Sequence, residues 1–225
     1  MNGIIVVNKP SGITSYDVIR FFKRKYNIKE KIGHSGTLDP LAQGVLVVCI
    51  GKATKLATMF MGMEKEYVAK MVLGKKTDTD DIDGKVVEEN PVSVDESQVM
   101  EVVRGFKGEI EQIPPIVSAI KHKGKPLYKH YRKGVIVAPS PRKVFIKDIE
   151  LLNLQIPYIQ FRVVCSKGTY IRALCRDIGN KLGCGGTQTE LKRTKVGNFL
   201  IKDSYTLEDI ETMGLEKVFI KMEQL

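Results

Sequence analysis

One short segment of the chain could hold a reactive carboxylate. Residues 33–44 read GHSGTLDPLAQG, with Asp39 near the middle, and they lead directly into an apolar run from Gly44 to Ile50. Glycine and proline at this density indicate a tight loop, and a loop that enters a buried strand is backed by packed chain. Asp39 could therefore be chemically active, or it could cap the turn; local composition leaves both interpretations open.

Nucleotide-phosphate motifs do not fit the sequence. A P-loop needs Gly-x4-Gly-Lys-Ser/Thr, but Gly44 lies too far from Gly51, and Ala53 replaces the hydroxyl residue. No Gly-x-Gly-x-x-Gly sequence follows a predicted strand. The acidic residues 78–83 resemble a calcium loop, but with Gly84 in the glycine position the ligand spacing fails. A hydrogen-bonded turn is the better interpretation of that run.

Histidines and cysteines form no catalytic or metal-binding pattern. His34, His122 and His130 fall in glycine-rich or basic segments that we expect to be loops. His34 lies five residues before Asp39 and could serve the site or hydrogen-bond within its own loop. The cysteines lie singly without CxxC spacing, so we predict reduced structural thiols and no metal at Cys49, Cys165, Cys175 and Cys184.

Apolar periodicity predicts the elements that position these residues. The strands are expected at 3–7, 44–50, 66–73, 85–88, 144–153, 159–165 and 188–196, the last strand of the chain. The helices are expected at about 15–26, 95–106 and 169–182. Strands and helices do not alternate strictly, and several strands adjoin one another. This pattern favours an α+β domain on a mixed or largely antiparallel sheet.

Positive charge is concentrated in one part of the chain. The net charge is +10, and residues 112–147 hold nine basic side chains and no acidic one. Tyr128 and Tyr131 interleave with these charges, which is typical of surfaces that bind looped or single-stranded RNA, although solvated surface is the plain alternative. The basic side chains are Lys121, Lys123, Lys125, Lys129, Arg132, Lys133, Arg142, Lys143 and Lys147. No apolar run approaches the ~18 residues that cross a bilayer, and no signal peptide precedes the first strand, so we expect a cytoplasmic protein without membrane contact.

The loop around Asp39 resembles the catalytic motif of the TruB family of tRNA pseudouridine synthases. The likeness continues in order over roughly Gly3 to Phe199, which makes it very specific. The matching segments are Asn8–Gly12, Gly33–Leu46, Lys65–Tyr67, Gly74 with Thr77–Asp80, Gln112–Pro115 with Ser118–Ala119, Cys165–Arg172 and Leu182–Gly185.

This resemblance implies a fold and an activity. The fold would be that of the pseudouridine synthases, with a mixed, mostly antiparallel central sheet, flanking helices and loops, and a basic thumb-like insertion at about 115–143. The activity would be isomerisation of uridine 55 in the T loop of tRNA to pseudouridine, by base flipping and without metal or cofactor. Full-length bacterial members usually carry a C-terminal PUA domain, for which the 26 or so residues after Phe199 are too few. We therefore expect residues 1–225 to form a single catalytic domain, monomeric, in a short natural or truncated chain.

The resemblance also assigns roles residue by residue. Asp39 matches the catalytic aspartate, Tyr67 the tyrosine that packs on the target base, and Arg172 the arginine that pairs with the aspartate. His34 matches the histidine that enters the T loop when the base is extruded. Lys9, Tyr170 and Leu191 fall in the pocket wall or behind it. Within the insertion we expect RNA contacts from Lys121, Lys123, Lys125, Arg132, Arg142 and Lys143.

The chemistry requires an ionised Asp39, since burial alone raises a carboxyl pKa and an opposed arginine lowers it. The resemblance leaves open whether the carboxylate attacks C1′, attacks the ring or abstracts a ribose proton. A non-catalytic tRNA-binding or tRNA-folding protein on the same scaffold is the alternative. It explains the basic insertion, but it does not explain why Asp39, Tyr67 and Arg172 occur together.

Overall fold

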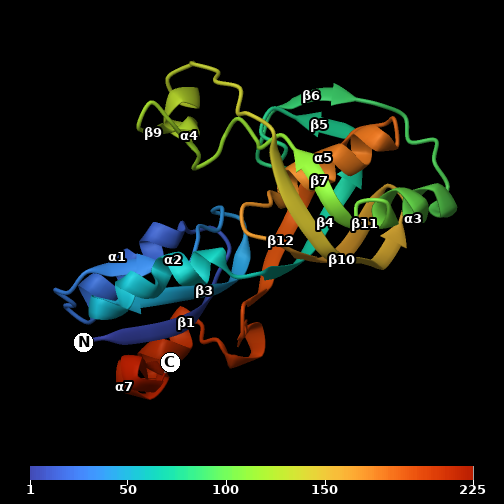
Figure 1. Cartoon of the computed structure of the whole chain (residues 1–225). Helices are drawn as coiled ribbons and strands as arrows, with labels where there is room; N and C mark the ends of the chain where they lie inside the picture. The colour runs from blue at the N-terminus through green and yellow to red at the C-terminus, as the bar shows by residue number, and fades with distance from the viewer. Residues whose placement is uncertain (225) are drawn as a thin grey trace. The chain divides into compact units, whose positions relative to one another are not determined.

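In the computed structural model, which describes residues 1–224, the chain forms two compact units. Unit 1 combines Met1–Val68 with Leu191–Leu225, and unit 2 is Ala69–Glu190 (Figure 1). Two strands, β4 (Lys65–Leu73) and β12 (Gly186–Val196), run from one unit into the other. Each of these two strands therefore contributes residues to both units.

Unit 1 is built around the buried strand β3 (Gln43–Ile50). β1 (Gly3–Lys9) pairs with it antiparallel along its whole length, and β14 (Ile220–Lys221) adds to the other side of β1. β12 pairs with β3 in parallel, through Lys192 opposite Gln43 and Arg193 opposite Gly44. Both pleat faces of β3 are buried because helices and loops cover each side, which explains its unbroken apolar sequence. The shorter antiparallel neighbours are β2 (Ile32–His34), on β3, and β13 (Phe199–Leu200), on β12.

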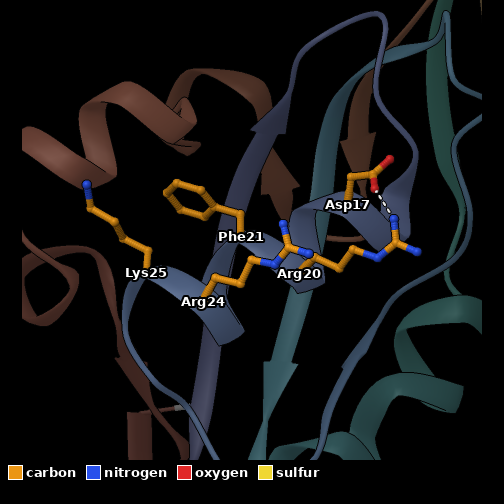
Figure 2. A pocket seen from close by; sticks show the side chains of 5 residues that line it. All are labelled: Asp17, Arg20, Phe21, Arg24 and Lys25. Atoms are coloured by element: carbon orange, nitrogen blue, oxygen red, sulfur yellow. Dashed lines mark hydrogen bonds and ion pairs between the residues drawn. The ribbon is translucent and has the colours of Figure 1, made fainter.

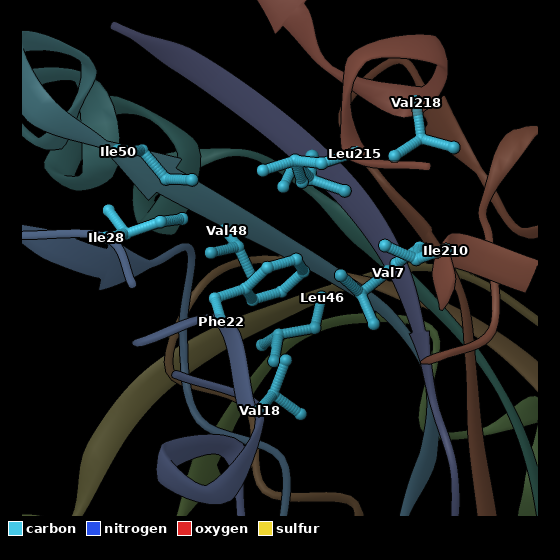
Figure 3. Close-up of a cluster of buried hydrophobic side chains, with 11 residues drawn as sticks. Val7, Val18, Phe22, Ile28, Leu46, Val48, Ile50, Ile210, Leu215 and Val218 are labelled. Atoms are coloured by element: carbon cyan, nitrogen blue, oxygen red, sulfur yellow. The ribbon is translucent and has the colours of Figure 1, made fainter. Parts of the chain in front are cut away.

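Helix α1 (Ser15–Lys25) begins where the sequence predicts and closes one side of this core. Thr14 and Asp17 form a reciprocal capping box at its start. Val18 and Phe22 face inward and join the apolar cluster drawn in Figure 3. The remaining helical segments of unit 1 are η1 (Gly51–Leu56), α2 (Ala57–Gly62), η2 (Ile201–Asp203), α6 (Leu207–Met213), α7 (Leu215–Val218) and η3 (Met222–Gln224).

The cluster in Figure 3 joins the two ends of the chain. Ile210, Leu215 and Val218 from α6 and α7 pack with side chains of β1, β3 and α1. Each such side chain contributes roughly 1.5–3 kcal/mol of burial free energy. The strand predicted at residues 188–196 is present as β12, but the prediction that it is the last strand is wrong, because β13 and β14 follow it. Because residues 203–216 carry many acidic side chains, we did not predict the short amphipathic helices there that complete the core.

Unit 2 is a sheet with helices packed against it, in which β10 (Arg142–Gln155) pairs antiparallel with β11 (Tyr158–Cys165) and β7 (Gly108–Gln112). The order of its strands is β12, β4, β11, β10 and β7. The helices α3 (Glu96–Arg104) and α5 (Ile171–Lys181) begin and end close to the predicted positions, although Phe106 lies beyond the end of α3. A hairpin of β5 (Lys75–Thr77) and β6 (Val86–Glu89) carries the acidic turn of residues 78–83.

The predicted basic insertion is a separate segment of unit 2. It holds β8 (Lys121–His122), β9 (Lys125–Pro126) and the short helix α4 (Leu127–Tyr131), which extends away from the strands of this unit in Figure 1. Two of the histidines expected in loops lie in these elements, and the third, His34, ends β2. The mixed, mostly antiparallel α+β fold is confirmed. Among residues 1–224, no helix is both long and apolar enough to cross a membrane.

Candidate active site

Asp39 lies in the loop between β2 and β3, as the sequence predicts. Its side chain is half-buried, and its backbone carbonyl accepts a hydrogen bond from Ala42 N at 3.1 Å, which closes a turn. Earlier in the loop, the buried Ser35 is fixed to β3: its N–H donates to Val47 O at 2.9 Å, and its Oγ accepts from Val47 N at 3.2 Å. The loop is therefore tied to the most buried strand of unit 1 rather than exposed on a free surface.

Lys9 lies underneath this loop, completely buried. Its Nζ donates to Ile13 O at 2.7 Å, Pro10 O at 2.8 Å and Pro40 O at 3.1 Å, the last belonging to the residue after Asp39. Burial lowers the pKa of Lys9 to about 8, and the Asp39 carboxylate opposes that effect. The role of Lys9 in the pocket wall or behind it, and its direct contact with RNA, stay predictions.

We expect activity to fall as the pH rises through about 8, because Lys9 then loses the positive charge that faces Asp39. A pH–rate profile should show this alkaline limb, and Lys9→Arg should move it to higher pH, since arginine does not titrate there. Lys52→Arg, at an exposed lysine, should leave the limb in place.

Unfolding cannot produce the same limb through Lys9. Its folded-state pKa lies below the ordinary value of 10.5, so between about pH 8 and 10.5 the unfolded chain binds more protons at this residue. The contribution of Lys9 to the free energy of unfolding therefore rises with pH while activity falls. A melting temperature that collapsed in step with activity would contradict the assignment.

His34 ends β2 and makes the hydrogen bond within its own loop that was one of its two predicted roles. Gly36 N donates to its Nδ1 at 3.3 Å. Burial, and then the nearby Arg193 guanidinium, lower the pKa of His34, so the ring is neutral at neutral pH. Because Nδ1 is an acceptor, the neutral ring carries its proton on Nε2. Entry of this ring into an RNA loop stays a prediction.

Tyr67 and Leu191 are buried strand residues of unit 1, on β4 and β12. Beside Tyr67, the Glu66 carboxylate accepts a hydrogen bond from Thr194 Oγ1 at 2.8 Å, which ties β4 to β12. The buried Lys65 donates from Nζ to three carbonyls at the end of α2, including Met63 O at 2.6 Å. These contacts fix the backbone that carries Tyr67.

Arg172 lies in the first turn of α5, in unit 2, and is buried. Its guanidinium donates to Thr79 O at 2.9 Å and Val117 O at 3.1 Å, and its Nε lies 3.9 Å from the Asp81 carboxylate. These contacts connect the acidic turn with the base of the basic insertion. The pairing of Arg172 with Asp39 stays a prediction.

One turn further along α5, Arg176 contacts the same acidic turn, so the two arginines share a face of the helix. Arg176 binds Asp80 at 2.8 Å and Asp177 at 2.9 Å. Burial raises the pKa of Asp80, and Arg176 opposes this effect. Asp78 accepts hydrogen bonds from Tyr131 OH at 2.6 Å and Lys85 N at 2.9 Å. The acidic run is thus the predicted hydrogen-bonded turn; within residues 1–224, no group of three or more metal-ligating side chains is arranged to hold an ion.

Tyr170 precedes α5 and is positioned by a residue that sequence reasoning did not single out. The buried Gln112 donates from Nε2 to Tyr170 O at 3.1 Å and accepts from Tyr170 N at 2.8 Å. The Arg142 guanidinium stacks 5.8 Å from the Tyr170 ring centre. Gln112 lies within a segment that matches the family, and this was the only sequence signal for it.

The predicted RNA contacts of the insertion are mostly exposed. Arg142 is half-buried, Lys143 pairs with Glu109 at 2.8 Å, and Arg132 lies over the Tyr128 ring at 5.6 Å. The exposed members are Lys121, Lys123, Lys125, Arg132 and Lys143. The structure thus leaves their charged ends accessible to a polyanion.

A cavity of about 530 Å³ lies along α1, away from the residues predicted to be catalytic. Figure 2 shows Arg20 bound to Asp17 on its wall, beside Phe21, Arg24 and Lys25. None of the predicted catalytic residues lines it. We therefore place the candidate active site at the Asp39 loop.

Comparisons with known proteins identify the family of the chain. The family model described as TruB family pseudouridylate synthase (N terminal domain) matches residues 23–171, and the one described as tRNA pseudouridylate synthase B C-terminal domain matches residues 172–222. The proteins named tRNA pseudouridine synthase B of Clostridium tetani and Clostridium kluyveri are 52% and 46% identical to the chain. Both alignments cover the whole chain, and they cover 78% and 77% of the relatives respectively.

Solved structures show the same fold. A chain in the crystal structure of a Cbf5–Nop10–Gar1 complex is 33% identical with a TM-score of 0.76, and one in an H/ACA RNP bound to a substrate RNA containing 2′-deoxyuridine is 31% identical with a TM-score of 0.73. Each comparison covers 99% of this chain but only 60% of the solved one. Fold, loop and family models together define a pseudouridylate synthase, an isomerase. The chain belongs to the TruB family.

Proposed function

We propose that the chain converts uridine 55 in the T loop of tRNA to pseudouridine, with Asp39, Tyr67 and Arg172 as its catalytic residues. The observation that carries this proposal is the full-length identity, up to 52%, to relatives named tRNA pseudouridine synthase B. The rigid mounting of Asp39 in unit 1 supports it. We further propose that both units act together as a single catalytic domain and that the chain acts as a monomer.

The reaction moves one bond and one proton. The N1–C1′ bond breaks, uracil rotates, a C5–C1′ bond forms, C5 loses its proton and N1 gains one. The target base first leaves the loop at a cost of a few kcal/mol, which is smaller in a loop than in a duplex. Asp39 supplies the carboxylate, Arg172 orients it, and Tyr67 offers a flat face and a phenol near C5. A neutral His34 fills the vacated space without bringing a charge among stacked bases.

The basic insertion supplies the sequence-independent grip on the RNA. Its exposed lysines carry positive charge on a segment without an acidic residue. Phosphate neutralisation releases counterions, so the slope of log K against log salt concentration is about −0.7 per contacted phosphate for unpaired RNA. Binding should therefore weaken strongly with salt, and a salt-insensitive interaction would contradict an RNA substrate.

Replacing Lys121, Lys123 and Lys125 together by glutamine should weaken T stem-loop binding about tenfold and make the salt slope shallower by about 2. Fluorescence anisotropy at several salt concentrations measures both quantities. A matched control replaces Lys23, Lys29 and Lys31, which are exposed on and after α1, by glutamine. Equal weakening in the control would assign the effect to net charge rather than to the insertion.

The direct test incubates the purified chain with an unmodified T stem-loop and maps pseudouridine by carbodiimide labelling. We expect a single modified position, at uridine 55, and none in a stem-loop with cytidine there. Tight binding with no pseudouridine would favour the non-catalytic tRNA-binding alternative. Modification at another uridine would keep the enzyme class and overturn the proposed position.

A further inference from the structure

Two side chains outside the Asp39 loop hold its backbone at positions on each side of the aspartate. Ser15 is the buried first residue of α1. Its Oγ donates to Leu38 O at 3.1 Å and accepts from Leu38 N at 2.9 Å. One hydroxyl thus fixes both backbone groups of the residue before Asp39. Only a group that donates and accepts can do this, which excludes alanine and valine.

Arg193 binds the chain on both sides of Asp39, in the loop before it and in β3 after it. Its Nε donates to Val45 O at 2.7 Å, after Asp39, and its Nη2 donates to Gly36 O at 3.1 Å, before it. The backbones also meet closely: Gly44 has φ +109°, and a Cβ there would lie 2.1 Å from Arg193 O. The planar, rigid fork of a guanidinium suits two carbonyls at a fixed separation.

Arg193 is buried, although arginine side chains are usually exposed on protein surfaces. Its side chain is 1% exposed, and within residues 1–224 no carboxylate lies at ion-pair distance from it. Burying an arginine without an acidic partner is unfavourable unless carbonyls satisfy it. One of its acceptors, Gly36 O, belongs to the Asp39 loop and the other, Val45 O, to the start of β3, so its burial ties the loop to that strand.

We propose that Ser15 and Arg193 are positioning residues, which set the place and direction of the Asp39 carboxylate by fixing the backbone of residues 36–45. The inference rests on the proposed function and adds to it two residues that do not touch the RNA. Reacting groups must meet within a narrow range of distance and angle, so a shift of about 1 Å can lower a rate about 100-fold. A loosened loop should therefore slow chemistry and leave RNA binding unchanged.

The test measures single-turnover rates and RNA dissociation constants of Ser15→Ala and Arg193→Lys with the T stem-loop. We expect each rate to fall about 10–100-fold and each dissociation constant to change less than about threefold. Arg193→Lys keeps the buried cation and shortens its reach, so it provides a folded variant if larger changes at this site prevent folding. Hydrogen exchange of residues 36–45 should rise in both.

Ser204→Ala is the matched control. The Ser204 hydroxyl also donates to a backbone carbonyl of unit 1, Ile201 O at 2.6 Å, but outside the Asp39 loop. Its single-turnover rate should match the wild type even if its melting temperature drops as much as that of Ser15→Ala. Wild-type rates in Ser15→Ala and Arg193→Lys, or an equal loss in Ser204→Ala, would overturn the inference. An inactive wild-type chain would instead overturn the proposed function.

Discussion

Asp39→Asn is expected to abolish pseudouridine formation, with a fall of at least about 1000-fold, because a neutral amide can act neither as nucleophile nor as base. The substitution keeps the side-chain shape, and the loop is fixed by Ser15, Ser35 and Arg193 through contacts that do not need the Asp39 carboxylate. RNA affinity should therefore stay within a few-fold of the wild type. Carbodiimide mapping and anisotropy measure the two outcomes separately.

Asp203→Asn is a suitable control for the loss of one negative charge, since Asp203 is an exposed residue of unit 1. It should leave turnover unchanged. Residual activity of Asp39→Asn at a tenth of the wild-type rate would remove Asp39 from the chemistry. A matching loss of RNA affinity would show instead that the carboxylate supports binding.

Tyr67→Phe is expected to let RNA bind and to slow product formation by about 100- to 10,000-fold, the range for removal of a proton-transfer group. The phenylalanine keeps the flat face that would stack on the base and loses only the hydroxyl. The strand around it stays fixed by the bond between Glu66 and Thr194. Single-turnover rates with the T stem-loop measure the effect.

Tyr158→Phe, at an exposed tyrosine of β11, is the matched control and should be silent. Unchanged turnover in Tyr67→Phe would exclude a proton-transfer role for the phenol. Recovery of an intermediate, rather than unreacted uridine, would show that the Tyr67 hydroxyl acts in a step that follows cleavage of the glycosidic bond. A loss of binding would assign Tyr67 to base capture alone.

The sequence predicts the fold well where apolar spacing is strong. The strands β1, β3, β4, β10 and β11 and the helices α1, α3 and α5 lie close to their predicted bounds. The prediction fails after residue 196, where short elements carry many charges and only Ile210, Leu215 and Val218 point to a core. Periodicity needs more turns than such segments provide.

Residue types and the family resemblance predict the candidate site residues, but they do not predict the side chains that hold the backbone around Asp39. Asp39, Tyr67 and Arg172 come from motif positions. The hydrogen bonds of Ser15 and Arg193 to the backbone of residues 36–45 were not predicted, because a bond from a side chain to a distant carbonyl leaves no pattern in the sequence. Lys9 was predicted in the pocket wall or behind it, but its three carbonyl partners, which lie up to 31 residues away in the sequence, could not be predicted.

The pairing of β14 with β1 affects the order in which the chain can fold during synthesis. β1 leaves the ribosome well before β14, so Gly3 and Ile4 meet their partners Lys221 and Ile220 only after all the residues between them have emerged. Unit 2 lies between these segments in the sequence and can be complete earlier. Unit 1, which carries Asp39, is therefore finished after unit 2, and until then one edge of β1 and the apolar side chains that pack against α6 and α7 need protection from aggregation.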